Sequence, residues 1–284
     1  MSTAAHDGPV PTVDLTTPTG PVPIPQLGFG VWQVPQDEVA AAVTSALETG
    51  YRHLDTAAMY QNESGVGQAV TDSGLGDNVW ITTKLNNNAH GFDAAMKAFD
   101  ASMDKLQRET LDLYLIHWPL PHENTYPEAW KAMQALRDDG RITTIGVCNF
   151  QVPHLQRLFD ETGEYPAINQ IELHPYLVQQ ELRNFHAANG IITEAWSPLA
   201  SGGDVLTDGT IKEIADAHGV TPAQAILRWH LQLGNVVIPK SVTPDRIRQN
   251  FDVFGFEFTD AEVGRITALD RGERTGPDPD TFTG

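Results

Sequence analysis

The stretch Leu111-Asp112-Leu113-Tyr114-Leu115-Ile116-His117 places a short, mostly apolar run directly before a histidine. A run nearly continuous in apolar and β-branched residues is typical of a strand buried on both faces of a parallel sheet. Similar runs recur along the chain, and loops and helical patterns lie between them. We therefore expect strands at Arg52–Asp55, Val79–Lys84, Leu111–Ile116, Thr143–Cys148, Ala167–Glu172, Ile191–Trp196 and Val236–Pro239, with an eighth near Gln26–Gly28.

Helical signals fill the spaces between these runs. Residues Gln36–Thr49 repeat apolar side chains at helical spacing, and Gly50 can end that helix. Capping-box sequences at Thr221–Gln224 and Thr259–Glu262 mark two further helix starts. Eight strand–helix alternations over about 250 residues favour an α/β fold of the (β/α)8 TIM-barrel type.

The alternative fold is an open, doubly wound sheet, which requires a glycine-rich fingerprint after its first strand. Gly65–Val70 lacks the third glycine and lies within a helical pattern, and Gly28–Gly30 has only two glycines of the set. The barrel is therefore the preferred prediction. Two earlier strand-like runs, Val10–Leu15 and Gly20–Ile24, flank a turn sequence and predict a β-hairpin that closes the barrel floor.

Composition sets the domain organisation and the expected surroundings of the protein. No linker divides the chain, so we expect a single domain over residues 1–284, with residues 1–9 flexible and a C-terminal loop at residues 270–284. The net charge of −19 predicts no affinity for nucleic acid or for anionic membranes. The chain has no signal-peptide pattern and no membrane-spanning run, and Cys148 is its only cysteine. These features predict a cytoplasmic protein.

Polar or aromatic residues stand at the ends of successive predicted strands. A lone aspartate after a strand is usually a helix cap, and a lone buried histidine is usually a core residue. A series of such residues carries more weight, because a barrel points the C-terminal ends of its strands into one basin. The series predicts an active site and consists of Asp55, Lys84, His117, Asn149, Gln170 and Trp196.

Longer motifs surround these residues. Taken in order, they strongly resemble the aldo-keto reductase family, and the resemblance runs from about Gln26 to Phe282. Within the family, Ala195–Leu199 and Arg274–Pro279 resemble the bacterial 2,5-diketo-D-gluconate reductase branch. The motifs that carry the family resemblance are Gly50–Glu63, Thr83–Leu85, Leu115–Pro119, Gly146–Phe150 and Ile238–Val242.

The resemblance implies a catalytic tetrad of Asp55, Tyr60, Lys84 and His117. Hydride transfer to a carbonyl builds negative charge on the carbonyl oxygen, so the site needs a proton donor. Tyr60 is the expected donor, Lys84 would lower its pKa, and Asp55 would hold Lys84 in place. His117 would hydrogen-bond the substrate oxygen and orient it. The role of Tyr60 comes from the resemblance rather than from its spacing along the chain.

The cofactor prediction begins with a basic cluster in this acidic chain. Lys240 follows the last predicted strand, and Thr243-Pro244 is typical of a helix start. Backbone N–H groups at that helix start, together with Lys240 and Arg246, would bind a phosphate. In the resembled family this segment contacts the adenosine 2′-phosphate, which implies NADPH rather than NADH.

Further cofactor contacts are implied by the resemblance. Trp196 would stack on the nicotinamide ring, and Asn149 and Gln170 would hydrogen-bond its carboxamide. The family usually has serine at the position of Cys148, and a thiol is a weaker hydrogen-bond partner, which puts carboxamide binding through that side chain in doubt. The remaining implied contacts to the cofactor are Ser197, Leu199, Ser241, Val242, Thr243, Gln249 and Asn250.

The substrate walls are expected to be apolar and to lie beside His117. Trp32, Met59 and Trp118 are the candidates, although aromatic residues there could equally belong to the core, and so could Met59. Small aldehydes, α-dicarbonyls and keto-sugars such as 2,5-diketo-D-gluconate are all open as substrates. The expected partner is thus a small-molecule carbonyl compound, and the expected state is a monomer.

The sequence therefore predicts an NADPH-dependent oxidoreductase that reduces aldehydes or ketones, with Tyr60 as general acid. A metal-dependent hydrolase on the same fold is one alternative. Such an enzyme would require a His-x-His pair at the first strand as metal ligands, with further His or Asp ligands at later strand ends. The chain offers only single histidines at such points, so we expect no metal. A non-catalytic or slow NADPH-binding module is the second alternative.

Overall fold

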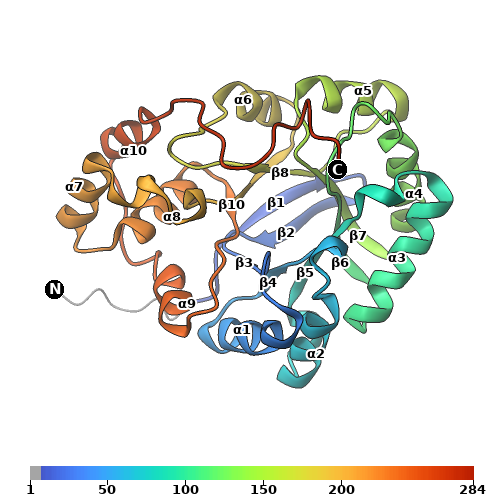
Figure 1. The fold of residues 1–284 in the computed structure, drawn as a ribbon, viewed down its shortest axis with the longest axis horizontal. Coiled ribbons are helices and arrows are strands. Elements are labelled where there is room, and N and C mark those ends of the chain that lie inside the picture. The colour runs from blue at the N-terminus through green and yellow to red at the C-terminus, as the bar shows by residue number, and fades with distance from the viewer. Residues whose placement is uncertain (1–7) are drawn as a thin grey trace.

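A closed ring of eight parallel strands forms the centre of the molecule. The computed structural model describes residues 8–284, and its main sheet runs in chain order from β3 to β10. The ring closes where the backbone N–H of Gly28 donates to the oxygen of Val237 at 2.9 Å. The predicted barrel is confirmed (Figure 1). Its strands are β3 (Phe29–Gly30), β4 (His53–Asp55), β5 (Trp80–Leu85), β6 (Leu111–Ile116), β7 (Ile142–Cys148), β8 (Ile168–Glu172), β9 (Ile192–Trp196) and β10 (Val236–Val237).

Helices surround this ring on the outside (Figure 1). One α-helix follows each strand from β3 to β8, two follow β9, and two follow β10. The α-helices are α1 (Gln36–Thr49), α2 (Glu63–Ser73), α3 (Phe92–Leu106), α4 (Tyr126–Asp138), α5 (Val152–Thr162), α6 (Gln180–Ala188), α7 (Gly209–His218), α8 (Pro222–Gln232), α9 (Pro244–Phe251) and α10 (Asp260–Thr267).

The predicted element boundaries agree closely with the structure except at the seam of the ring. The first barrel strand is at Phe29–Gly30 rather than near Gln26–Gly28, and β10 is shorter than expected. Pro239 has no backbone N–H to donate, which helps to explain why β10 ends early. Both predicted capping boxes form, ahead of α8 and α10. Gly50 ends α1 with a φ of 122°, a conformation that glycine adopts readily.

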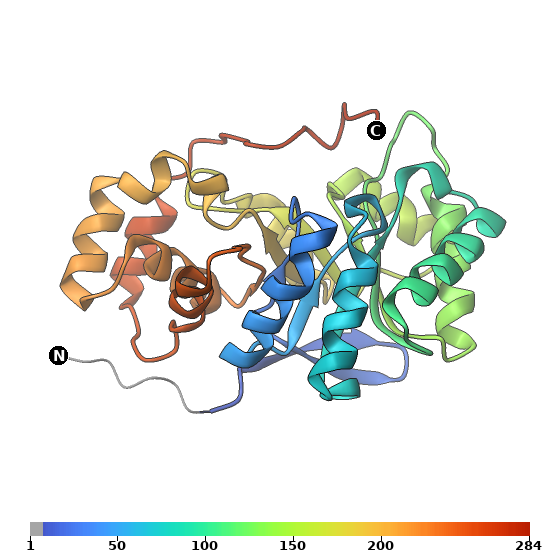
Figure 2. The same cartoon turned by 60° about the horizontal axis from the view of Figure 1, so that its bottom comes forward.

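The N-terminal hairpin closes one end of the barrel, as predicted. Strands β1 (Thr12–Thr17) and β2 (Gly20–Pro25) pair antiparallel, and each buries one large apolar side chain completely. These side chains, Leu15 and Ile24, belong to the same core cluster as Leu113 and Leu115 of β6. Figure 2 shows the hairpin at one end of the barrel and the C-terminal segment crossing the other end. Residues 1–7, most of the segment expected to be flexible, lie outside the described part of the chain.

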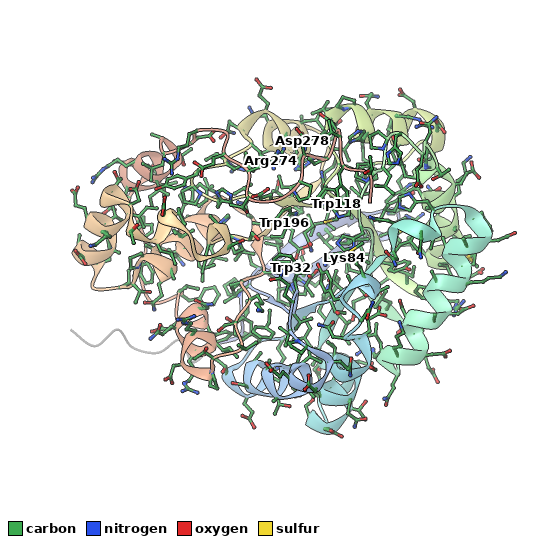
Figure 3. All side chains as sticks on the ribbon, viewed as in Figure 1. Trp32, Lys84, Trp118, Trp196, Arg274 and Asp278 are labelled. Atoms are coloured by element: carbon green, nitrogen blue, oxygen red, sulfur yellow. The ribbon has the colours of Figure 1, made fainter. Side chains whose placement is uncertain are left out.

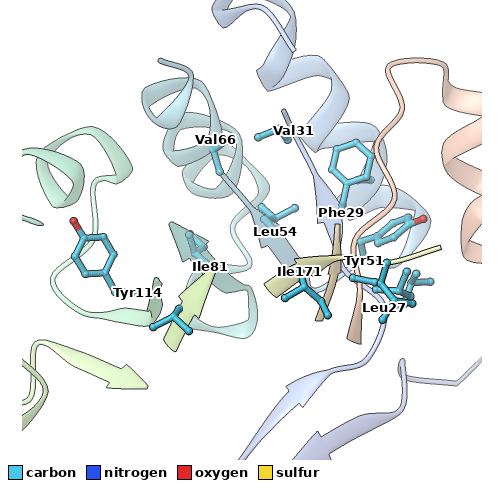
Figure 4. Packing of buried hydrophobic residues seen from close by; sticks show 14 of the residues in the cluster. Leu27, Phe29, Val31, Tyr51, Leu54, Val66, Ile81, Tyr114 and Ile171 are labelled. Carbon is cyan, nitrogen blue, oxygen red and sulfur yellow. The ribbon is translucent and has the colours of Figure 1, made fainter. Parts of the chain in front are cut away.

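A second core cluster fills the space between strands and helices (Figure 4). Leu54 of β4 and Ile81 of β5 pack there with Val66 of α2, and all three are fully buried. Phe29 and Tyr51 meet edge to face with ring centroids 5.5 Å apart. None of the helices within residues 8–284 combines the length and the hydropathy needed to cross a membrane.

The barrel interior leaves no room for a side chain at Gly146 of β7. A Cβ atom at this position would lie 2.6 Å from Ile168 Cγ2 and 2.7 Å from Leu115 Cδ2. We expect Gly146→Ala to lower the free energy of unfolding by about 2 kcal/mol, because overpacking a core costs about 1–3 kcal/mol. Guanidinium denaturation followed by circular dichroism measures this difference.

Gly264→Ala in α10 is the matched control. A Cβ atom there would meet nothing within 4 Å, so alanine should stabilise the helix by up to about 1 kcal/mol. If Gly146→Ala were as stable as the wild-type protein, the close packing inside the barrel would not be a constraint on β7.

Candidate active site

The predicted residues at the strand ends meet in one place, and a buried ion pair lies at its centre. Lys84 Nζ on β5 donates to Asp55 Oδ1 at the end of β4 over 2.6 Å. Gln170 Nε2 on β8 donates to the other Asp55 oxygen at 2.8 Å. The neighbouring strands β4 and β5 are thereby connected directly, and the Gln170 amide connects β8 to them from across the barrel. Figure 3 shows Lys84 near the middle of the barrel.

Asn149, which follows β7, connects the other predicted residues, His117 and Trp196. Its side-chain nitrogen donates to the backbone oxygen of His117 at 3.0 Å. Its side-chain oxygen accepts from Trp196 Nε1 at 2.8 Å. Asn149 adopts a left-handed conformation with a φ of 66°. Its amide therefore fixes the indole of Trp196 relative to the strand that carries His117.

Lys84 is fully buried and uses all three of its donors. Besides Asp55, it donates to the backbone oxygen of Thr56 at 3.0 Å and to the hydroxyl oxygen of Tyr60 at 3.4 Å. Burial acts to lower the pKa of Lys84, but Asp55 and then Tyr60 more than offset it, and the pKa is raised. The side chain therefore stays an ammonium ion at neutral pH.

Tyr60 ends the short 3-10 turn η1 (Ala58–Tyr60) that follows β4. Its hydroxyl oxygen accepts from Lys84, which leaves its own O–H proton for a further acceptor. Burial raises the pKa of Tyr60, and Lys84 opposes this only in part. Lys84 lowers the pKa of Tyr60, as expected, but desolvation raises it by more. Tyr60 is a phenol at neutral pH, the form in which it can donate a proton.

His117 lies beside Tyr60, with ring centroids 5.7 Å apart. Burial, followed by Lys84 and His90, holds the pKa of His117 well below its ordinary value. The ring is therefore a neutral imidazole, which has one N–H donor and one acceptor. A neutral imidazole can orient a carbonyl oxygen by hydrogen bonding without adding a second cation to the site.

The C-terminal residues 270–284, which we call the C-terminal strap, cross the open end of the barrel (Figure 2). Glu172, at the end of β8, accepts from the backbone N–H of Thr275 at 2.5 Å and from its hydroxyl at 2.6 Å. Further along, Phe282 packs on Trp118 with ring centroids 4.3 Å apart. Of the predicted substrate walls, Trp118 is thus buried under the strap, whereas Trp32 and Met59 are 48% and 40% exposed.

The predicted phosphate-binding segment lies at the start of α9. Lys240 and Arg246 are exposed, and neither forms an ion pair within residues 8–284, whereas Arg248 pairs with Asp245. Thr243 precedes α9 as predicted, but its side chain does not cap the helix. Instead, the hydroxyl oxygen of Ser241 accepts from the backbone N–H of Thr243 at 3.1 Å. Two unpaired cations therefore stand beside a helix start in a strongly acidic protein.

The remaining predicted cofactor residues fall on two segments of the same rim. Ser197 and Leu199 follow β9 and are half-buried, and Ser197 has a φ of 46°. Val242 and Gln249 are exposed and Asn250 is buried, all in or just before α9. The structure places both segments after consecutive strands of the ring, β9 and β10.

Comparison with known proteins bears directly on this site. The model of the Aldo/keto reductase family matches residues 26–271. An aldo-keto reductase of Mycolicibacterium smegmatis is 55% identical over 260 residues, which cover 91% of this chain and 94% of the relative. The methylglyoxal reductase DkgA of Escherichia coli is 53% identical over 263 residues, with coverage of 92% and 95%.

The chain belongs to the aldo/keto reductase family. The family predicted from the motifs is confirmed, and the protein is an oxidoreductase. Among solved structures, a mutant of Gox0644 in complex with NADPH is 46% identical, with a TM-score of 0.90 and coverage of 95% of this chain and 98% of that one.

Beneath the ion pair of this aldo-keto reductase lies a second carboxyl group. Glu194 of β9 is fully buried and accepts from Gln170 Nε2 at 2.9 Å, so the Gln170 amide bridges Glu194 and Asp55. Burial and then Asp55 raise the pKa of Glu194 to about 8. His53 lies 3.7 Å from the other Glu194 oxygen, and burial lowers the pKa of His53 to about 3. Both groups are therefore neutral at pH 7.

The contacts of Gln170 and Cys148 modify two expectations about the carboxamide site. The Gln170 nitrogen is committed to two carboxyl groups, so its oxygen is the atom left for a ligand, and the Cys148 thiol lies 3.6 Å from that oxygen. Burial raises the pKa of Cys148 well above its ordinary value, so the group is a neutral thiol. Glu194 was not among the residues predicted from sequence, although a glutamate inside the apolar run Ile191–Trp196 is a signal that could have identified it.

A pH-dependent stability test follows from the buried acid Glu194. Its pKa is about 8 in the folded protein and about 4.3 in an unfolded chain. Between these values the unfolded state releases a proton that the folded state keeps, so wild-type stability falls as the pH rises. Glu194→Gln removes this titration, and we expect its stability relative to wild type to improve by about 1 kcal/mol or more from pH 5 to pH 8.

Guanidinium denaturation at both pH values measures the effect, with Glu181→Gln, at an exposed glutamate of α6, as the control. A difference between Glu194→Gln and wild type that stays constant from pH 5 to pH 8 would contradict a neutral Glu194.

Proposed function

We propose that this chain reduces aldehydes and ketones to alcohols with NADPH, and that Tyr60 is the proton donor. The observation that carries this proposal is the contact of the Tyr60 hydroxyl with the Lys84 ammonium at 3.4 Å, on a rim that also holds His117. Tyr60 thus offers a protonated, half-buried hydroxyl in direct contact with a fully buried cation. That position suits an acid acting on a ligand oxygen.

NADPH, when bound, supplies the hydride to the carbonyl carbon. The side chains of this chain act on the carbonyl oxygen. His117, as a neutral imidazole, holds the oxygen by a hydrogen bond. Tyr60 donates its proton as negative charge grows on that oxygen, and the Lys84 ammonium stabilises the phenolate that remains. Asp55 keeps Lys84 charged and in place throughout.

The residues present fit a dinucleotide at three points. Trp196 offers a half-buried indole whose N–H is already fixed by Asn149, so the ring is pre-positioned for stacking. The Asn149 amide contacts this indole and the backbone oxygen of His117, and the Gln170 oxygen accepts from the Cys148 thiol. Lys240 and Arg246 supply positive charge at the start of α9 for phosphate groups. A 2′-phosphate contacted by Arg246 would make NADPH the preferred cofactor over NADH.

The substrate is proposed as a small carbonyl compound, with α-dicarbonyls, small aldehydes and keto-sugars as classes to test. The relative from Escherichia coli is named a methylglyoxal reductase, and methylglyoxal is an α-dicarbonyl. We also propose a cytoplasmic, monomeric enzyme without nucleic-acid or membrane partners, because the chain is strongly acidic and has a single cysteine.

Tyr60→Phe tests the acid directly. The substitution removes the proton donor and leaves the ring, so we expect kcat with methylglyoxal to fall by about 10²-fold to 10⁴-fold. NADPH affinity, measured by isothermal titration calorimetry, should stay within about twofold of wild type, since the hydroxyl is assigned to the substrate oxygen. Wild-type turnover in this variant would refute the assignment of Tyr60.

Arg246→Ala tests the cofactor preference. Loss of a charge-assisted contact to the 2′-phosphate should weaken NADPH binding by about tenfold or more. NADH has no such phosphate, so its affinity should change little. Arg248→Ala is the matched control, because Arg248 lies on the same helix but pairs with Asp245. An equal loss for NADPH and NADH in Arg246→Ala would contradict the 2′-phosphate contact.

A further inference from the structure

Two side chains in the loop after β5 have polar atoms that are buried and unpaired. Asn87 begins the 3-10 turn η3 (Asn87–Ala89), and His90 follows it. Neither the oxygen nor the nitrogen of the Asn87 amide, and neither ring nitrogen of His90, has a hydrogen-bond partner within residues 8–284. An unpaired buried donor or acceptor costs free energy, and such groups in a native protein call for an explanation.

The loop starts directly beside the proposed reaction site. The backbone N–H of His117 donates to the oxygen of Leu85, the last residue of β5, at 3.3 Å. His90 is close enough to His117 to help lower its pKa. His117 Nδ1 is itself buried without a partner among the described residues. Unpaired hydrogen-bonding groups are therefore found both on His117 and in the loop that begins beside its backbone.

The end of the C-terminal strap lies next to these groups. A Cβ atom on Gly284 would be 3.9 Å from the Asn87 amide nitrogen, and Phe282 packs on Trp118, the residue after His117. The strap thus contributes apolar and backbone surface over Asn87 rather than a hydrogen-bonding partner.

We propose that Asn87 and His90 form a polar subsite that binds a hydroxyl group of the substrate, next to the carbonyl held by His117. The inference rests on the proposed function and narrows its substrate class to hydroxylated aldehydes and ketones. Accommodating the substrate requires the end of the strap, Phe282 to Gly284, to move from Asn87. The strap remains attached through Thr275 and Glu172, which lie outside this subsite.

The chemistry of the two side chains selects a neutral hydroxyl over a carboxylate. Burial lowers the pKa of His90 to about 4, with Glu123 opposing, so its ring is neutral at pH 7. A primary amide and a neutral imidazole each offer both a donor and an acceptor, as a hydroxyl group does. A carboxylate would find no cation in this pair of side chains and would face the negative charge of Glu123. The second carbonyl oxygen of an α-dicarbonyl substrate only accepts hydrogen bonds, so it would use the donors of Asn87 and His90 and leave their acceptors unpaired.

The test compares two substrates of equal chain length, D-glyceraldehyde and propanal, which differ by two hydroxyl groups. We expect the wild-type enzyme to prefer D-glyceraldehyde in kcat/KM with NADPH. Asn87→Leu and His90→Leu should each lower kcat/KM for D-glyceraldehyde about tenfold, the effect of losing one or two hydrogen bonds. Asn87→Leu should keep kcat/KM for propanal within about twofold of wild type. For His90→Leu the readout is the ratio of kcat/KM for the two substrates, because His90 also acts on the pKa of His117.

Two controls separate a subsite from a structural role. Asn88→Ala, at the exposed neighbour of Asn87, should leave both substrates unchanged. His90→Gln keeps a donor and an acceptor and should restore part of the preference that His90→Leu loses. Leucine at position 87 also removes unpaired polar atoms, so that variant should unfold at a temperature no lower than the wild-type protein.

The outcomes are distinct. A selective loss with D-glyceraldehyde supports the subsite. An equal loss with both substrates, no loss with either, or a lower unfolding temperature for Asn87→Leu overturns it while leaving carbonyl reduction intact. If the wild-type enzyme oxidises no NADPH with any aldehyde or α-dicarbonyl, the proposed function is overturned and the subsite with it.

Discussion

The ammonium group of Lys84 inside the barrel is the constraint around which the site is arranged. A buried charge costs several kcal/mol unless it is paired and all of its hydrogen-bonding groups are satisfied. Here Lys84 has three acceptors, and both oxygens of its partner Asp55 accept hydrogen bonds. Well-packed apolar residues often stabilise a core as well as a buried ion pair does. The pair is therefore better explained by what it does to Tyr60 than by stability.

The titratable groups around the pair are neutral. Burial keeps Tyr60 protonated, and burial with Lys84 keeps His117 uncharged. Burial and the charge of Asp55 keep Glu194 protonated at neutral pH. Lys84 and Asp55 carry opposite charges and these neighbours are uncharged, so this part of the site has little net charge. No further charged side chain among them has to be removed from water. Negative charge that develops on a bound oxygen would then be stabilised mainly by Lys84 through Tyr60.

Sequence patterns predicted those parts of the site that follow from strand periodicity. Asp55 and His117 stand where apolar runs stop, and parallel strands of a barrel bring such ends together. Tyr60 lies in a turn, so no periodicity marks it, and its prediction needed the family motif. Glu194 is identified by its contact with Gln170 on another strand, and Asn87 by the absence of any partner for its amide among the described residues. Both depend on parts of the chain that are distant in sequence. At the barrel seam the apolar run Val236–Pro239 overstated the length of β10, which ends before Pro239, a residue without a backbone N–H.

Two buried glutamates have opposite protonation states because their neighbouring hydrogen-bond donors differ. Glu172 and Glu194 lie on adjacent strands, and both are at most 1% exposed. Burial alone would raise both pKa values, but at Glu172 donors from His174, Thr275 and the Gly276 backbone outweigh it, and its pKa is lowered. Glu194 has one amide donor and a nearby carboxylate, and its pKa is raised. Glu172 is thus an anion that holds the C-terminal strap, whereas Glu194 is a neutral acid that supports the Gln170 bridge. Because Gln170 and Glu172 are two residues apart on β8, one strand positions both the ion pair and the strap.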